Sequence, residues 1–391
     1  MSHAIQAYSA HCGVEPSRPQ FLDSFYPISF PKYIVFHSAE RNMPFENYNY
    51  WDLVLEMIKP YLIDNGYHIV QIQHGEEINT FSKFADKHLA NIGFQQCAYI
   101  IKNASAYLGT SNVFMHMASS SDKKIVALFG DSYPEAEGPY WNNNYRCVSP
   151  DFSKIKPFFG RGEEKKRINE VKPERLAAEF LSLLFGEDAK ANLSSLFIGD
   201  NYHNQTVEVI PDFFNPTILK PDQPVNIRGD LHFDAQFISD WLNGRRCNLF
   251  INPDKSTDLS LLSAFKPNIN RLNVFIDENT DINIIKNIKR SGVPMHLFCK
   301  EASKLEDVRL KFIDWIVDLF SLKEKKDLDN LEDINYTTSN FKSSKTVLSN
   351  NKAYPTLYHS KNKDSDPSKI FDDPLFWSDL DHLYIFNKTD A

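Results

Sequence analysis

The sequence predicts an α/β protein in which two domains each contain a parallel β-sheet. Short apolar runs typical of strands alternate with amphipathic runs typical of helices, in the first half of the chain and again in the second. The composition changes at residues 186–195, and we place the domain boundary there. At 391 residues the chain is long enough for two domains of ordinary size plus connecting segments.

Five segments follow from these patterns. They are a short helix with an irregular connector (1–30), the first α/β domain (31–190), the second α/β domain (200–320), a polar flexible linker (321–352) and an aromatic tail (353–391). The tail is expected to dock on a domain, because its two aromatic clusters would otherwise leave a large apolar patch in water.

The elements of the first domain follow in order along the chain. Apolar and β-branched runs predict strands at 33–36, 68–72, 125–129 and, at the edge, 146–148. Apolar stripes and end signals predict helices at 50–63, 81–89, 97–102, 113–119 and 171–185.

The second domain repeats this alternation. Strands are predicted at 207–210, 225–227, 247–251, 272–276 and 295–299. Helices are predicted at 233–242, 259–265, 283–290 and, with one apolar face, at 308–320.

The stretch 104–140 carries the sharpest signal for a binding site. A strand approach through Tyr107 ends in the small polar turn Thr110-Ser111-Asn112, which opens a short helix, and a buried strand follows. Such a turn supplies N-cap oxygens and backbone N–H groups at a helix N-terminus, where the helix dipole favours a phosphate. An anion site is therefore one interpretation of this turn, and a plain helix cap is the other.

Composition narrows the range of partners and compartments. The net charge of −8 and the pI near 5.9 give no general attraction to nucleic acid, so none is expected as a partner. There is no apolar run long enough for a membrane span, and the N-terminus lacks the pattern of a signal peptide. Five scattered cysteines without metal-ligand spacing are typical of reduced thiols, so a cytoplasmic location is expected.

The order of residues in 104–140 resembles the donor-binding half of glycosyltransferase family 9, the heptosyltransferase-like enzymes. The resemblance rests on the turn at 110–112, then His116 and Ala118, then a strand ending in Phe129-Gly130 and the loop that begins at Asp131. It covers about the first half of the chain, residues 1–185. It implies two Rossmann-like domains of GT-B type, with 1–30 as a hinge helix and connector and 31–190 as the nucleotide-sugar domain.

The resemblance also implies which residues bind the donor. Ser38 and Arg41 follow the first strand, where the family places polar groups facing the donor phosphates. The full set of expected donor-binding residues is Ser38, Arg41, Thr110, Ser111, Asn112, His116 and Asp131. The chain departs from the family where Ser111 and Val113 replace the usual Asp and Gly, which removes a carboxylate and keeps the backbone farther from the ligand.

If residues 1–30 are the hinge helix that the resemblance implies, the family's acceptor domain is expected elsewhere in the chain, and the second domain offers a counterpart. The predicted strand 225–227 runs into Gly229-Asp230 and a helix, which is similar to the opening of family 9 acceptor domains. A circular permutation would have moved the acceptor half to this place, and Asp230 would then be the catalytic base. The alternative is that Asp230 only caps the following helix.

Three functions are compatible with the sequence. The first is a glycosyltransferase that moves a sugar from a nucleotide-sugar to a glycan or other hydroxyl acceptor, without a metal and with no cofactor beyond that substrate. The second is a non-catalytic module that keeps the nucleotide-sugar fold for binding or assembly. The third is a nucleotide-sugar epimerase or hydrolase on the same architecture.

Overall fold

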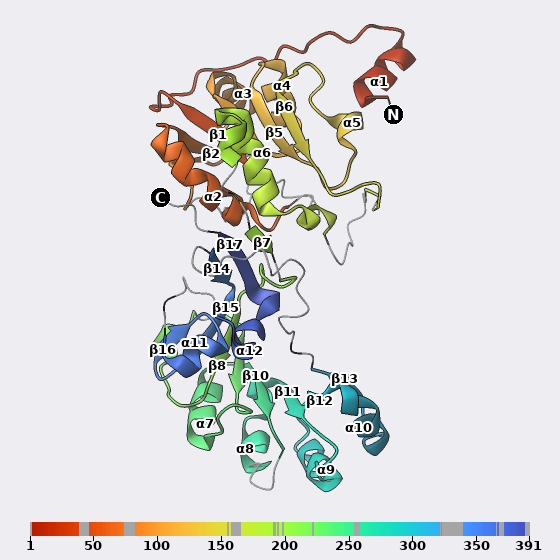
Figure 1. Cartoon of the computed structure of the whole chain (residues 1–391), viewed down its shortest axis with the longest axis vertical. Helices are drawn as coiled ribbons and strands as arrows, with labels where there is room; N and C mark the ends of the chain where they lie inside the picture. The colour runs from red at the N-terminus through yellow and green to blue at the C-terminus, as the bar shows by residue number, and fades with distance from the viewer. Residues whose placement is uncertain are drawn as a thin grey trace. The chain divides into compact units, whose positions relative to one another are not determined.

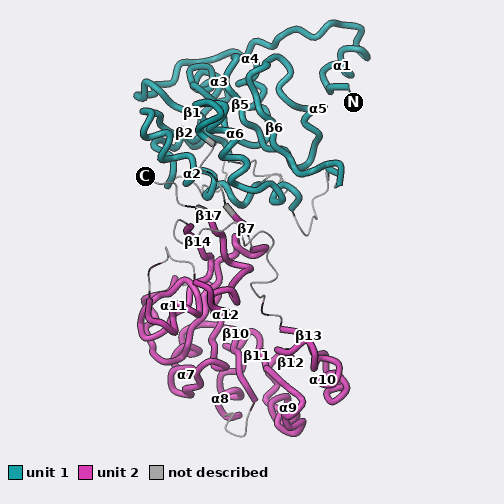
Figure 2. Tube along the Cα trace, viewed as in Figure 1, with its two compact units in different colours: residues 1–195 teal, residues 196–391 magenta. Residues whose placement is uncertain are grey.

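The chain forms two compact units, residues 1–195 (unit 1) and 196–391 (unit 2), each with its own largely parallel sheet (Figures 1 and 2). The predicted fold class, an α/β protein with two sheet-based units, is therefore confirmed. The computed structural model describes residues 2–38, 47–73, 83–154, 156–157, 166–190, 193, 195–197, 199–220, 223–253, 259–320, 322, 339–364, 366 and 371–387.

Unit 1 is built on a six-stranded sheet in the order β3-β2-β1-β4-β5-β6, and every neighbouring pair is parallel. This is the strand order of the Rossmann fold, in which the direction of winding reverses between β1 and β4. The strands are β1 (Tyr33–His37), β2 (His68–Ile72), β3 (Lys87–Leu89), β4 (Ala106–Thr110), β5 (Lys124–Leu128) and β6 (Tyr145–Val148).

Helices cover both faces of this sheet. Buried side chains of α3 and α4 join one face in a single core that includes Val35, Val70 and Ile125. Helices α2 and α6 contact each other and lie side by side in Figure 1, and α6 also contacts β5. The helices are α1 (Ala4–Cys12), α2 (Trp51–Asp64), α3 (Phe94–Asn103), α4 (Val113–Ser120), α5 (Pro134–Glu137) and α6 (Pro173–Phe185).

One element of unit 1 differs from its prediction. The helix expected at 81–89 is absent from the described part of that range, because 87–89 is strand β3, while 81–82 lie outside the described residues. The three residues of β3 pair with Val70, Gln71 and Ile72 of β2 at the sheet edge. A strand of three residues is too short to show an alternating pattern, so no strand could be predicted at this position.

Unit 2 contains an eight-stranded sheet in the order β13-β12-β11-β10-β9-β8-β15-β16. All neighbours are parallel except β15 and β16. The strands are β8 (Thr206–Val209), β9 (Val225–Arg228), β10 (Cys247–Ile251), β11 (Ile269–Phe275), β12 (Met295–Cys299), β13 (Val317–Leu319), β15 (Lys345–Ser349) and β16 (Lys352–Tyr354).

Four helices pack on one and the same face of this sheet. Their buried residues, such as Trp241, Leu262 and Ile285, form one core with the apolar strand residues of that face. The strands β8 to β13 follow one another across the sheet, so right-handed connections place every linking helix on the same side. The helices are α7 (Ala235–Gly244), α8 (Leu259–Ala264), α9 (Ile282–Arg290) and α10 (Leu305–Lys311).

The predicted amphipathic helix at 308–320 is wrong for most of its length. Helix α10 ends at Lys311, and β13 extends the sheet by pairing Val317 with Leu297. Ile313 and Ile316 are each 77% exposed, so they do not belong to a buried helix face. The apolar residues that suggested a helical stripe are divided between a turn and an edge strand.

The linker predicted at 321–352 also differs from the structure where the structure describes it. Strands β14 (Ser339–Ser343), β15 and β16 occupy its second part, and β15 lies beside β8 in the main sheet. Most of 321–338 lies outside the described residues. Polar residues are frequent in β14 and β15, which made the segment look irregular, although all residues of β15 except Thr346 are buried.

The C-terminal tail packs within unit 2. Strand β17 (Leu383–Asn387) pairs antiparallel with β14, and a three-stranded sheet forms in the order β14-β17-β7, with β7 at Ser195–Phe197. Phe376, Trp377 and Leu383 are buried with Phe341 in a core of their own. The tail helices are α11 (Leu357–Asn362) and α12 (Pro374–Trp377).

Candidate functional site

The carboxyl ends of β1 and β4 meet at the winding reversal of unit 1. In sheets of this kind, ligands bind in the crevice at that point. The register places His37 beside Gly109, so the residues that leave the two strands are neighbours. The structure therefore brings Ser38, Thr110, Ser111 and Asn112 to one edge, whereas Arg41 lies outside the described residues.

Asn112 is the N-cap of α4, and both ends of its amide are engaged. Its Oδ1 accepts hydrogen bonds from the backbone amides of Phe114 at 2.8 Å and Met115 at 3.3 Å. Its Nδ2 donates to Nδ1 of His37 at 2.8 Å. A third contact comes from the hydroxyl of Tyr107, which donates to Oδ1 at 3.2 Å.

These contacts fix the tautomer of His37. Backbone amides only donate, so the Asn112 atom facing them must be the carbonyl oxygen, and its NH2 group faces the imidazole. Nδ1 of His37 is then an acceptor, and the ring proton is on Nε2. The ring is buried and packs edge-on against Phe114 at a centroid distance of 4.8 Å.

Gly109 allows the two strand ends to come this close. A Cβ atom at this position would lie 2.5 Å from the carbonyl oxygen of His37 and 2.6 Å from the hydroxyl of Tyr107. Both distances are too short for a real side chain, and the first neighbour is backbone, which cannot move away cheaply. The absence of a side chain at 109 is thus a condition for the contact between His37 and Asn112.

The cap changes what the N-terminus of α4 can offer to an anion. The amides of Phe114 and Met115 are already bonded to Asn112, and that of Ser111 donates to the carbonyl of Leu128 at 2.9 Å. Within the described part of the chain, the amides of Asn112 and Val113 have no such partner and remain available. The helix end keeps its dipole but presents fewer open donors than an uncapped one.

Two further predicted residues lie close to this edge in sequence. His116 follows on α4 and is half-buried, and burial lowers its pKa, with His3 lowering it further. His3 caps α1 and its Nε2 is 3.0 Å from the carbonyl oxygen of Gly138. Asp131 stands in the loop after β5 beside Ser132, whose buried hydroxyl has no hydrogen-bond partner among the described residues.

The polar edge continues onto the next strands. Gln73 follows β2, and its Oε1 lies 2.7 Å from Nε2 of His88 in β3. Burial lowers the pKa of His88. Neither residue was among the predicted site residues, and neither was His37. The signal that marks all three is a polar side chain within a strand or directly after it, at the carboxyl edge of a parallel sheet.

Asp230, the predicted base, lies in unit 2 and is tied to Arg228. The guanidinium donates to both carboxylate oxygens, Nε to Oδ1 at 2.7 Å and NH2 to Oδ2 at 2.9 Å. The side chain of Asp230 is fully buried. The alternative prediction, that Asp230 caps the next helix, is wrong, because Asp234 accepts from the amides of Gln236 and Phe237 there.

This pair belongs to a chain of buried charges. Arg228 also donates to Glu208 at 2.8 Å, Glu208 lies 3.1 Å from Nζ of Lys345, and Lys345 pairs with Asp379 of the tail. Burial opposes ionisation of Glu208, but the two cations outweigh it and lower its pKa. Burial likewise opposes the charge of Lys345, but Glu208 and Asp379 raise its pKa above the usual value.

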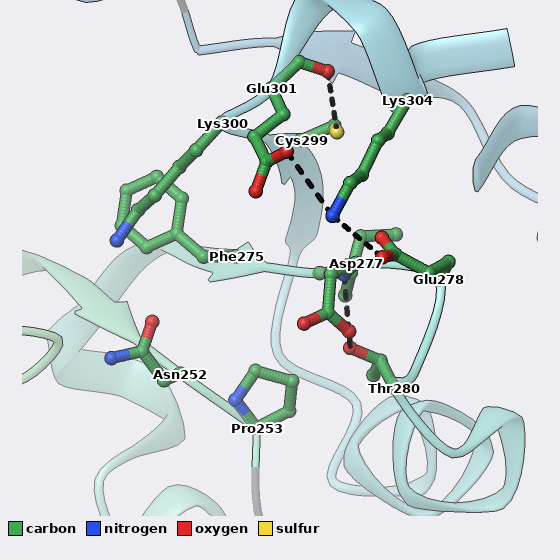
Figure 3. A pocket seen from close by; sticks show the side chains of 11 residues that line it. Asn252, Pro253, Phe275, Asp277, Glu278, Thr280, Cys299, Lys300, Glu301 and Lys304 are labelled. Atoms are coloured by element: carbon green, nitrogen blue, oxygen red, sulfur yellow. Dashed lines mark hydrogen bonds and ion pairs between the residues drawn. The ribbon is translucent and has the colours of Figure 1, made fainter. Parts of the chain in front are cut away.

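Unit 2 also contains a pocket of about 270 Å³ at the carboxyl ends of β10, β11 and β12 (Figure 3). Polar and charged side chains surround it together with a few apolar ones. They are Asn252, Pro253, Phe275, Ile276, Asp277, Glu278, Thr280, Cys299, Lys300, Glu301 and Lys304. None of these residues was among the predicted site residues.

Two general features of the described residues bear on the site. None of their helices is both long and apolar enough to cross a membrane. No three or more His, Cys, Asp or Glu side chains in the described ranges lie close enough together to hold a metal ion.

Comparison with known proteins identifies a family match within the first unit. Residues 16–167 match the family model for glycosyltransferase family 9 (heptosyltransferase). The search of curated proteins gave no match.

Three solved structures are similar to part of the chain. An ADP-heptose LPS heptosyltransferase II from E. coli is 20% identical with a TM-score of 0.32, over 48% of this chain and 54% of that one. A glycosyl transferase family 9 protein from Veillonella parvula is 15% identical with a TM-score of 0.32, over 46% and 50%. The E. coli heptosyltransferase WaaC with ADP is 13% identical with a TM-score of 0.33, over 46% and 54%.

The alignments span about half the length of these solved relatives. The family match covers β1 to β6 and the whole winding reversal of unit 1. The resemblance noted in the sequence is therefore confirmed for the first unit: residues 16–167 match glycosyltransferase family 9 (heptosyltransferase).

Proposed function

We propose that this protein is a glycosyltransferase that moves a sugar from a nucleotide-sugar to a hydroxyl group of a glycan or other acceptor. The match of residues 16–167 to glycosyltransferase family 9 is the observation that carries the proposal. The Rossmann strand order of the same residues supports it, since the winding reversal is where such a sheet binds a nucleotide.

The donor is proposed to bind at the ends of β1 and β4. Transfer requires stabilisation of the negative charge that develops on the departing nucleoside diphosphate. The open amides of Asn112 and Val113, at the positive end of α4, are suited to this, and the predicted Arg41 would add a cation. Charge stabilisation of this kind needs no metal, and the proposed transfer is therefore metal-independent.

The acceptor is proposed to use unit 2, in the arrangement that a circular permutation would produce. The strand β9, which leads into Gly229-Asp230 and then a helix, supports this. The pairing of both Asp230 oxygens with Arg228 weighs against Asp230 as the base that takes the acceptor proton. We therefore propose unit 2 as the acceptor side without assigning the base to Asp230.

The proposal is tested by ligand binding followed by turnover. Thermal shift is measured with ADP-, UDP-, GDP- and CMP-sugars, and release of the nucleoside diphosphate is then measured with and without candidate acceptors. We expect one nucleotide class to stabilise the protein and release to depend on an acceptor. Absence of any shift would exclude a nucleotide-sugar enzyme.

A second candidate, a non-catalytic module that keeps the fold for binding or assembly, is favoured by one observation. Oδ1 of Asn112 accepts the hydrogen bonds of the Phe114 and Met115 amides, which are then no longer open to the donor phosphates. In addition, Val113 stands where the family has Gly. In the same experiment, a thermal shift without release under any acceptor condition would select this candidate.

The role of His116 is tested with a matched pair of variants. His116→Ala is expected to weaken donor binding, whereas the exposed His11→Ala is expected to bind as the parent does. Equal donor affinity of His116→Ala and the parent would leave His116 as a structural histidine.

A further inference from the structure

We infer that the pocket of unit 2 at the ends of β10, β11 and β12 binds a single sugar ring or a polyol of that size. The inference deepens the proposed function, in which unit 2 is the acceptor side, but it concerns unit 2 alone and requires no nucleotide. The pocket lies at the carboxyl edge of a parallel sheet, which is where such sheets bind ligands.

The size of the pocket limits its occupant. Its volume of about 270 Å³ is just below the range of roughly 300–1,000 Å³ that is typical of sites for drug-sized ligands. A nucleotide-sugar exceeds this space, whereas one six-membered ring with its hydroxyl groups fits it.

Asp277 offers one fixed carboxylate oxygen to the pocket. Its Oδ1 accepts from the hydroxyl of Thr280 at 2.7 Å and from the amide of Asn279 at 2.9 Å, which holds the side chain in a tight turn after β11. The other oxygen points into the space between Asp277 and Asn252 in Figure 3. The bond from Thr280, with the two backbone amides, lowers the pKa of Asp277, so this oxygen is an ionised acceptor near neutral pH.

Lys300 offers an ammonium group on the opposite side. Its Nζ lies 4.0 Å from the centre of the Phe275 ring and 3.9 Å from Oδ2 of Asp230, so neither contact is a hydrogen bond. No hydrogen-bond partner for it is present among the described residues. The side chain is 43% exposed, and its donors are therefore open to a ligand.

Asn252 completes the set of polar groups. Its Nδ2 donates to the backbone carbonyl of Asp230 at 2.8 Å, which fixes the amide and leaves Oδ1 as an acceptor. The pocket thus presents fixed acceptors and an open donor at separate points of its wall. Hydroxyl groups both donate and accept, so a polyol satisfies all of them, whereas a ligand with donors only or acceptors only does not.

The charges of the lining disfavour an anionic ligand. Lys304 is already paired with Glu278 at 2.6 Å and with Glu301 at 3.2 Å. The remaining charges, Asp277 and Lys300, are of opposite sign, so the pocket has no surplus of positive charge. A phosphate would face three carboxylates, which is unfavourable in a site partly shielded from water.

Apolar side chains supply the rest of the wall. Phe275, Ile276 and Pro253 line the pocket beside the polar groups. The C–H faces of a sugar ring are apolar, and burying them against such side chains contributes to binding.

The inference is tested on the full chain in the absence of nucleotide. Methyl β-D-glucopyranoside, methyl β-D-galactopyranoside, methyl α-D-mannopyranoside and myo-inositol are titrated by saturation-transfer NMR and calorimetry, with sodium phosphate as the anionic probe. We expect saturable binding of at least one polyol with a dissociation constant on the order of 1 mM. Failure of all four to saturate at about 50 mM would overturn the inference.

Variants locate the binding. Lys300→Met and Asp277→Asn are expected to weaken it by about tenfold or more, while the exposed Lys286→Met and Asp314→Asn stay within about twofold. Asn at 277 keeps the acceptor that the turn requires, and Lys300 is not part of the turn, so the two variants do not share one folding defect. Unchanged binding in both, or full displacement by phosphate, would contradict a polyol site here.

The test of the pocket and the test of the proposed function can be told apart by their results. Polyol binding without any response to nucleotide-sugars would support the pocket and argue against the transferase. A response to nucleotide-sugars without polyol binding would do the reverse.

Discussion

The side-chain amide of Asn112 lies 2.8 Å from Nδ1 of His37 and joins the ends of β4 and β1. One side chain therefore caps α4 and links the two strands at the point where the sheet reverses its winding. The link closes part of the helix end that a phosphate would use. Removing it should affect stability and ligand binding in different directions.

The first prediction separates these two effects. Asn112→Ala removes the cap and should lower the free energy of unfolding by about 1 kcal/mol, while Asn112→Gly should lose less at the cap itself. Asn112→Gly also frees the amides of Phe114 and Met115, so the affinity for ADP should rise roughly two- to tenfold. Calorimetry with ADP gives the affinity, and urea unfolding gives the stability. Weaker ADP binding by Asn112→Gly would identify Asn112 itself as a ligand-binding residue.

The second prediction concerns the close approach at Gly109. Gly109→Ala forces a Cβ atom against the carbonyl of His37 and the hydroxyl of Tyr107, and should destabilise unit 1 by about 1–3 kcal/mol. Gly244→Ala is the control, because a Cβ atom there meets nothing within 4 Å. That control should be neutral or slightly stabilising at the end of α7. The melting temperatures of the two variants are compared, and equal values would contradict the close approach of β1 and β4 at Gly109.

Much of the fold follows from the sequence, because the longer helices and strands contain several apolar residues at the spacing of their element type. The strands at 33–36, 68–72 and 247–251 are predicted by short runs rich in apolar residues, and the structure has a strand at each. Short strands at the sheet edges have too few residues to show such a spacing. Strands β3 and β13 have three residues each, and the sheet edge beside them determined their conformation.

The candidate site is less visible in the sequence for a different reason. The turn at 110–112 could be found because a strand, a polar triplet and a helix are adjacent in the chain. The contact of Asn112 with His37 spans 75 residues, and the pairing of Arg228 with Glu208 spans 20. Such partners are brought together by strand order, which local pattern does not specify.

The third prediction distinguishes a structural Asp230 from a catalytic one. Asp230→Asn leaves Arg228 without one of its carboxylate partners and should lower the free energy of unfolding by about 2 kcal/mol. If the proposed transferase is active, the rate of nucleotide release should change by less than about threefold, because loss of a general base costs roughly 10²–10⁴. Asp314→Asn, on the surface, is the matched control. A rate loss in that larger range, with a stable fold, would restore Asp230 as the base.

The fourth prediction concerns pH. Burial lowers the pKa of His88, His116, His359 and His382 below the ordinary value of 6.5. Between the lowered pKa and 6.5 the unfolded chain binds protons that the folded chain does not, so stability should fall as the pH drops below about 7. The melting temperature measured from pH 8 to 5 should therefore decrease toward acid.

A substitution shows how much one histidine contributes to the change of melting temperature with pH. His116→Gln should flatten it, whereas His232→Gln, on an exposed residue, should leave it as it is. A melting temperature that rises on acidification would mean that these histidines gain protons more readily in the folded state, opposite to the effect of their burial.

The fifth prediction tests the buried charges that connect the main sheet of unit 2 to its tail. Lys345 stands between Glu208 and Asp379, and all three are largely buried. Lys345→Met leaves buried Asp379 without its cation and leaves Glu208 with Arg228 alone, which should cost about 3–5 kcal/mol and lower the melting temperature by on the order of 10 °C. Lys352→Met, an exposed change of the same kind, should stay within about 0.5 kcal/mol. The double variant Lys345→Met with Asp379→Asn should be more stable than Lys345→Met alone, because the unpaired buried charge of Asp379 is then removed. If the double variant instead loses the sum of both single effects, the two residues do not act as a pair, and the tail is held by its apolar core alone.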